Sequence, residues 1–154
     1  MTIDEYLGLA NKLRRHVATC EKRYFNTFTR ATSPKDPLNL DGTPTSNGST
    51  YNSMERKFIE NADASRELTK ARKTYQEYLD LVRGDMKMLY FWEGLVIERI
   101  YFENPIVEER DPRDGINYIL NTNNRREIRK KVDEAKRHLT DIMRARGVDI
   151  DYPN

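Results

Sequence analysis

Apolar residues recur every three or four positions near the start of the chain. Their spacings are 4, 3, 4, 3, 4 and 4. The series is Tyr6, Ala10, Leu13, Val17, Cys20, Tyr24 and Phe28. This heptad-like pattern predicts a helix of about 25 residues with an apolar seam on one side. Such a helix needs a partner along its whole length.

Residues 31–52 interrupt the pattern, because prolines and glycines there break both helix and strand periodicity. We expect a flexible loop. Asn52 and Glu55 then resemble an N-cap and its capping-box partner, and apolar residues continue at helical spacing to Val82. Two striped helices joined by a loop predict an antiparallel, coiled-coil-like hairpin over residues 1–84. One seam alone is marginally stable, so a third helix or a second copy should complete the core.

The densest apolar stretch runs from Tyr90 to Phe102 and predicts a third helix whose aromatic residues lie in the core. Gly84 either kinks the preceding helix or separates two helices. A break near Gly84 is favoured, with Asp85 as the next N-cap, and the Asn104–Pro105 pair should end the third helix. A strand over residues 94–102 is the alternative, since β-branched and aromatic residues are frequent there.

Two further helices are expected before a short tail over residues 147–154. Pro112 suits the first turn of a short helix that carries apolar residues up to Leu120. Asn124 has the N-cap signature of a longer helix, which runs to about Arg146 and is stopped by Gly147. The chain is therefore predicted to be all-α: a long hairpin over 1–84 and a smaller lobe over 85–146.

Charge is unevenly distributed. The whole chain has a net charge of +2, yet seven cations and three anions fall between Arg125 and Arg137. On a helical wheel the apolar residues of this last helix occupy one arc, and most of its cations occupy the adjacent arc. One face should pack while the other stays basic. A merely solvated basic face is the plain alternative, and Asp133 inside the basic arc supports it.

A short helix, a polar turn and a longer basic helix form the layout of a helix-turn-helix. In that motif the start of the second helix approaches base edges, and cations further along approach phosphates. The candidate DNA-binding residues are Asn123, Asn124, Arg125, Arg126, Arg129, Lys130, Lys136 and Arg137.

The same region carries a resemblance. The sequences VIERIYFE from Val96, INYIL from Ile116 and NRREIRKKVDEAKRHL from Asn124 resemble the fourth region of bacterial sigma factors. They are also similar to small Gram-positive phage regulators of the ArpU and RinA type. The resemblance implies a phage or prophage transcription regulator that contacts double-stranded promoter DNA and host RNA polymerase.

Other classes of chemistry find little support. A single cysteine, Cys20, excludes an internal disulfide and multi-cysteine zinc modules, and it fits a reducing compartment. His16 and Cys20 share a helical face but are too few ligands for a structural metal. No phosphate-binding glycine loop or nucleophile elbow is present, so no enzyme and no cofactor are expected.

The expected location is the host cytoplasm, away from the membrane. Asp4 and Glu5 stand where a secretory signal needs basic and then apolar residues, and no stretch approaches the roughly 20 apolar residues of a membrane span. Two rival functions stay open. One is a helical adaptor or inhibitor that binds a host protein such as a polymerase or a defence protein, and the other is a phage packaging or structural component that assembles through its hairpin.

Overall fold

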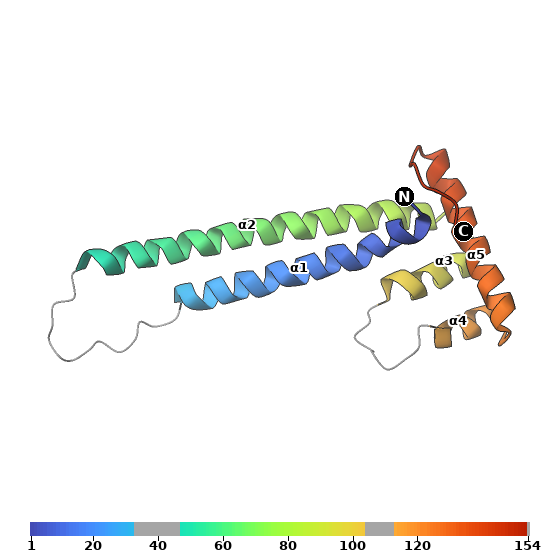
Figure 1. Cartoon of the computed structure of the whole chain (residues 1–154), viewed down its shortest axis with the longest axis horizontal. Helices are drawn as coiled ribbons and strands as arrows, with labels where there is room; N and C mark the ends of the chain where they lie inside the picture. Colours follow the sequence, from blue (N-terminus) through green and yellow to red (C-terminus); the bar gives the residue numbers. More distant parts are fainter. Residues whose placement is uncertain (33–46, 104–112, 154) are drawn as a thin grey trace. The chain divides into compact units, whose positions relative to one another are not determined.

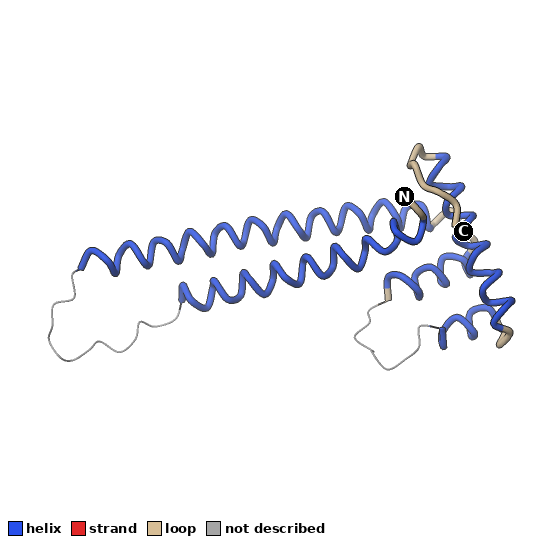
Figure 2. Tube along the Cα trace, viewed as in Figure 1, coloured by secondary structure: helices blue, strands red, loops and turns tan. Residues whose placement is uncertain are grey.

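The computed structural model describes residues 1–32, 47–103 and 113–153, and these are helical with short connecting turns (Figures 1 and 2). No strand occurs among them, although Thr2 and Asp151 form one isolated bridge. The predicted all-α class is confirmed. The elements are α1 (Ile3–Thr32), α2 (Asn47–Met86), α3 (Phe91–Ile97), the π-helical turn η1 (Glu98–Phe102), α4 (Arg113–Leu120) and α5 (Arg125–Ala145).

The described chain divides into two compact units. One contains residues 14–75, and the other contains residues 1–13 together with residues 76–154. The second unit therefore includes the start of α1 and the last turns of α2, whereas the sequence pattern suggested a division near residue 84. Ile3 and Leu7 are fully buried, which explains why the first turns of α1 belong with the C-terminal elements.

Within the unit of residues 14–75, α1 and α2 form the antiparallel hairpin that the apolar pattern predicted (Figure 1). Cys20 packs with Leu68 and Ala71 at the seam. On α1, Glu21 accepts a hydrogen bond from Arg72 at 2.8 Å, and Thr27 lies 3.1 Å from Asn61. These contacts pair increasing residue numbers on one helix with decreasing numbers on the other, as an antiparallel pair requires.

Both long helices begin earlier than predicted. The first starts at Ile3 because Thr2 and Glu5 form reciprocal bonds, with Thr2 N–H donating to Glu5 at 2.8 Å and Glu5 N–H donating to Thr2 Oγ1 at 3.3 Å. This is a capping box, which satisfies two free N–H groups at the helix start. α2 begins at Asn47, inside the segment predicted as a loop, so Asn52 is not its N-cap. The rest of that predicted loop, residues 33–46, lies outside the described residues.

The helix does end close to Gly84, as predicted, but Asp85 is not the N-cap of the next helix. α2 continues to Met86 and ends in a turn closed by Leu89 N–H donating to Met86 O at 3.1 Å. Val82 and Asp85 are both buried, three residues apart on one face. Packing of that face outweighs the modest helix penalty of one glycine. Asp85 is therefore part of the last turn of α2 and not an N-cap.

The third helix is present, but its aromatic residues are not all core. Glu93 accepts from Tyr90 N–H at 3.0 Å, which starts α3 at Phe91. Tyr90 and Phe91 are 67% and 84% exposed. Trp92 alone of the three packs against the cluster around Val96. The prediction that Tyr90 and Phe91 lie in the core was wrong. Three consecutive residues point in different directions around a helix, so they cannot all face inward. The proposed Asn104–Pro105 stop and Pro112 lie outside the described residues.

The C-terminal tail is part of the folded unit that contains residues 1–13 and 76–154. Ile150 is fully buried, and its carbonyl accepts from Arg144 Nε at 2.8 Å. Asp151 N–H donates to Met1 O at 2.9 Å, and the Asp151 carboxylate lies 3.1 Å from the terminal ammonium. The tail thereby joins the two ends of the chain.

Gly147 ends α5, as predicted. Its φ is +89°, Gly147 N–H donates to Arg144 O at 2.8 Å, and Val148 N–H donates to Met143 O at 3.0 Å. We expect Gly147→Ala to destabilise the protein by about 1 kcal/mol, because alanine disfavours this left-handed backbone. Urea unfolding followed by circular dichroism measures the loss. Gly8→Ala is a matched control, since Gly8 has no positive φ and open space around it, and an equal loss there would contradict the account.

Candidate functional site

The basic helix α5 is held by apolar contacts to α4 and α3. Val96, Ile116 and Leu120 are buried together, and partly buried apolar residues of α5 pack against them. Those residues are Ile128 and Val132. Further along α5, Ala135 and Leu139 are fully buried. The predicted packing face of the last helix is thus confirmed, which leaves its opposite face open.

The turn between α4 and α5 fixes where the basic face begins. Asn121 adopts a left-handed φ of 50°, and Thr122 N–H donates to Asn117 O at 3.2 Å. Asn124 is the N-cap, as predicted: its Oδ1 accepts from Arg126 N–H at 3.1 Å. The expected capping-box partner Glu127 instead accepts from the Thr122 hydroxyl at 2.8 Å.

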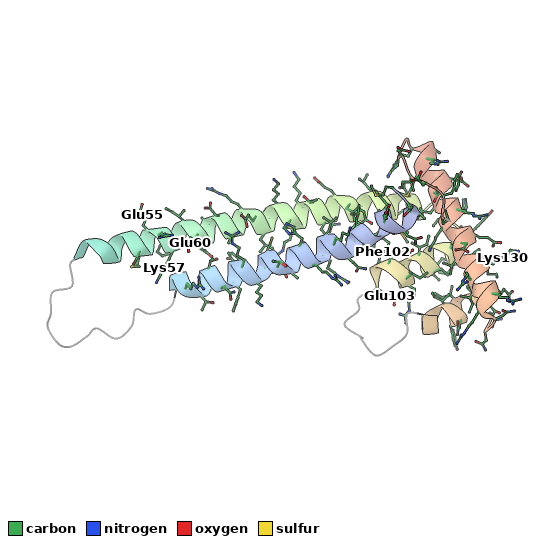
Figure 3. The ribbon with its side chains drawn as sticks, in the orientation of Figure 1. Glu55, Lys57, Glu60, Phe102, Glu103 and Lys130 are labelled. Carbon is green, nitrogen blue, oxygen red and sulfur yellow. The ribbon has the colours of Figure 1, made fainter. Side chains whose placement is uncertain are left out.

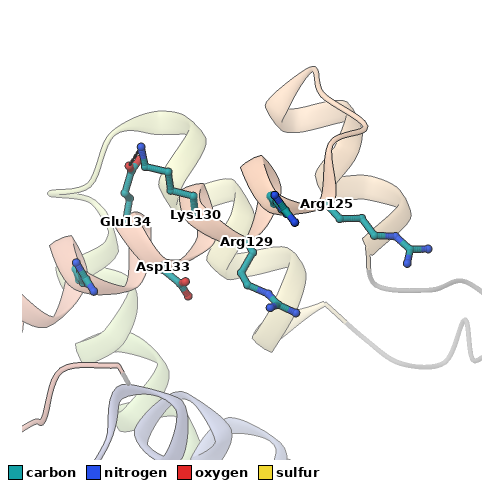
Figure 4. A pocket seen from close by; sticks show the side chains of 7 residues that line it. Arg125, Arg129, Lys130, Asp133 and Glu134 are labelled. Atoms are coloured by element: carbon teal, nitrogen blue, oxygen red, sulfur yellow. Dashed lines mark ion pairs between the residues drawn. The ribbon is translucent and has the colours of Figure 1, made fainter.

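A shallow hollow of about 510 Å³ runs along the open face of α5 (Figure 4). Five cations and two carboxylates line it. They are Arg125, Arg126, Arg129, Lys130, Arg137, Asp133 and Glu134. Five of the eight predicted site residues therefore share one surface, which we call the α5 basic surface. Asn123 is exposed just before it.

The cations of this surface are only weakly engaged by the protein. Lys130 lies 3.9 Å from Glu134, and the two side chains are 78% and 51% exposed. An exposed pair at this separation contributes little stability, so Lys130 can leave it at small cost. Figure 4 shows Arg125 extending away from that pair, and Figure 3 shows Lys130 projecting outward from α5. The surface is thus a set of available guanidinium and ammonium groups.

Lys136 differs from the other candidates. Its side chain is only 15% exposed and lies 2.8 Å from Asp4. The Tyr101 hydroxyl also donates to Asp4. Partial burial alone would raise the pKa of Asp4, but the hydrogen bonds from Lys136 and Tyr101 outweigh it and lower that pKa. In this structure Lys136 therefore anchors α5 to the first turn of α1.

We expect Lys136→Ala to reduce stability by about 1 kcal/mol and to leave the DNA affinity of the folded protein unchanged. Because the folded-state pKa of Asp4 is lowered, its contribution is present above the ordinary aspartate pKa and lost as the pH falls through the folded-state value. Thermal unfolding at neutral and acidic pH measures this, and a difference from wild type that persists in acid would contradict it.

One exposed aromatic residue that the sequence pattern did not single out lies on the helix that precedes α5. Tyr118 on α4 is 93% exposed, three residues before the turn that begins at Asn121. A phenol in such a position can donate to a phosphate oxygen. The sequence pattern of α4 gave no reason to single out Tyr118, because aromatic residues in short helices usually pack against a core.

The two residues considered as metal ligands, His16 and Cys20, lie one turn apart on α1. Cys20 is buried as predicted, and its Sγ lies 3.8 Å from His16 Nε2. Within the described part of the chain, no group of three His, Cys, Asp or Glu residues could hold a metal ion. None of the helices that the structure describes combines the length and the apolar character needed to cross a bilayer.

Comparison of the chain with protein-family models, with curated proteins and with solved structures finds no match.

Proposed function

We propose that the protein is a phage or prophage transcription regulator that binds double-stranded DNA through the α5 basic surface. The observation that carries the proposal is the start of α5: Arg125 and Arg126 lie exposed in its first turn, directly after a capped N-terminus. Helix-turn-helix proteins read bases from this position. The resemblance to sigma region four and to ArpU and RinA regulators supports the same assignment.

The residues divide by position. Arg125 and Arg126 stand where a guanidinium can pair with guanine, and Asn123 precedes them in the turn. Arg129, Lys130 and Arg137 continue along the surface and would meet phosphates. Asn124 acts indirectly, because its side chain already accepts a hydrogen bond from Arg126 N–H. Tyr118 is an added candidate for a backbone contact.

The salt dependence of binding tests the proposal. Each neutralised phosphate contributes a slope of about −0.9 to the plot of log association constant against log salt concentration. Three to five cations of the α5 basic surface in contact with phosphate would give a slope of roughly −2.7 to −4.5. Fluorescence anisotropy with a short duplex measures it. A slope near zero, or no binding at low salt, would contradict DNA binding by this surface.

A specific observation also favours a protein partner. Met88, Tyr90 and Phe91 are 71%, 67% and 84% exposed, and they follow one another around the start of α3. Exposed apolar groups of this density often mark protein contacts. Binding to host RNA polymerase, implied by the resemblance, would use such a surface alongside DNA. An adaptor or inhibitor would use it alone, and its binding would be insensitive to mutations on α5.

A further inference from the structure

Three phenylalanines lie exposed on the hairpin unit of residues 14–75. Phe25 and Phe28 on α1 are 67% and 44% exposed, and Phe58 on α2 is 53% exposed. The contact between Thr27 and Asn61 shows that these parts of the two helices lie at the same level. Three exposed aromatic rings therefore lie at one level of the hairpin.

The three rings also share a face. Phe25 lines a hollow of about 530 Å³ together with Tyr24 of α1 and with Leu68 and Arg72 of α2. At 100° per residue, Phe58 lies about 40° around α2 from Arg72, on the same side. Phe28 follows Phe25 by three residues, and its ring contacts Tyr24 with centroids 6.1 Å apart. We call this set of side chains the aromatic face.

The seam inside the hairpin is small by comparison. Among the described residues of this unit, those classed as buried and apolar are Cys20, Ala64, Leu68 and Ala71. Only Leu68 is a large aliphatic residue. Val17 and Tyr24 pack partly buried against this seam. The hairpin therefore buries few large apolar side chains between its own helices, and long helices obtain most of their stability from packing an apolar face.

We propose that a second copy of the chain covers the aromatic face, so that two hairpins pack as a four-helix bundle. The charges on this face favour a copy over a strongly charged partner. The Glu21 carboxylate and the Arg72 guanidinium lie 2.8 Å apart and neutralise one another. Lys22 is the other charged side chain that lines the hollow, so the net charge of the hollow is small. Two-fold interfaces are self-complementary, which suits such a surface. Antiparallel hairpins commonly assemble in this way.

The three phenylalanines supply part of the area that this occupant needs. With side chains of about 200 Å² each, the exposed parts of the three phenylalanines amount to roughly 650 Å² over two copies. That is about half of what a stable interface requires. Tyr24, Leu68 and the stems of Lys22 and Arg72 line the adjoining hollow and supply further surface. The inference does not depend on DNA binding.

Sedimentation equilibrium of the full chain tests the proposal through two neighbouring substitutions. Phe58→Glu places a carboxylate on the aromatic face of each copy and should weaken self-association by about 100-fold or more, because like charges would meet in the interface. Ile59→Glu is the matched control: Ile59 is 54% exposed, as Phe58 is 53%, but it lies about 140° from Arg72 around the helix.

The expected result is a wild-type mass of twice 18.2 kDa, the same mass for Ile59→Glu, and a monomer for Phe58→Glu. Circular dichroism of each variant confirms that it is folded. A monomeric wild type at high concentration would overturn the proposal. So would a dimer that survives Phe58→Glu, or one that Ile59→Glu disrupts equally.

Discussion

Replacing Arg125 and Arg126 together with alanine is expected to weaken sequence-specific DNA binding strongly while leaving the fold intact. Both side chains line the open hollow of α5, and neither is among the buried residues of that helix. A lost bidentate contact to guanine costs about 1–3 kcal/mol. The double variant should therefore bind its site about 100-fold more weakly. Anisotropy titration against the specific duplex measures the change.

A charge-matched control separates recognition from general electrostatics. Arg15 and Arg30 are exposed on α1, so the variant Arg15→Ala/Arg30→Ala removes the same charge from another part of the chain. It should reduce affinity only slightly, because neither arginine belongs to the α5 basic surface. Equal losses in the two double variants would show that Arg125 and Arg126 have no special role.

The second large effect concerns stability. Asp85 is 4% exposed, and its carboxylate faces Arg146 at the C-cap of α5, with Nη2 lying 2.9 Å from Oδ2. The contact is an ion pair without hydrogen-bond geometry, so within the described residues Oδ2 has no hydrogen-bond donor. Arg146→Ala would leave this buried carboxylate unpaired. We expect a loss of about 2–3 kcal/mol at neutral pH, less than for fully buried pairs because Arg146 is partly exposed.

The pH dependence of this loss has a defined sign. Burial raises the pKa of Asp85, and the Arg146 charge opposes that rise. An acid with a raised folded-state pKa makes its best contribution below the ordinary aspartate pKa, and that contribution is lost as the pH rises through the folded-state value. Removal of Arg146 raises the pKa further. The Arg146→Ala defect should therefore be smaller in mild acid than at neutral pH.

Urea unfolding at the two pH values measures both effects, and Asp85→Asn/Arg146→Ala is the control. The neutral amide removes the charge that Arg146 compensates, so this double variant should be more stable than Arg146→Ala alone at neutral pH. A defect that is equal at both pH values, or that the amide does not relieve, would show that the ion pair is not its cause.

The helix content of the C-terminal region could be predicted because its signals are local. Asn124 caps α5 and Gly147 ends it, and both effects arise within one helical turn. The missed start of α1 was equally local, since Thr2 and Glu5 form the capping box. Apolar periodicity does not reveal this capping box, because Thr2 and Glu5 precede the regular apolar series.

Tertiary contacts explain the other differences. Asp85 was expected to cap the next helix, yet it is buried beside Arg146 in the last turn of α2. Lys136 was grouped with the basic surface, yet it is paired with Asp4, more than a hundred residues earlier in the sequence. A helical wheel shows the residues of one segment, so it cannot show a partner that lies far away in the sequence.

Anisotropy titration of the wild-type protein against duplex tiles from its own genomic neighbourhood tests the central claim most directly. The tiles are compared at low and at physiological salt. We expect the protein to stay bound to one tile at physiological salt, because base contacts survive where phosphate contacts weaken steeply. Uniform binding that disappears with salt, or no binding to any tile, would contradict a sequence-specific DNA-binding function.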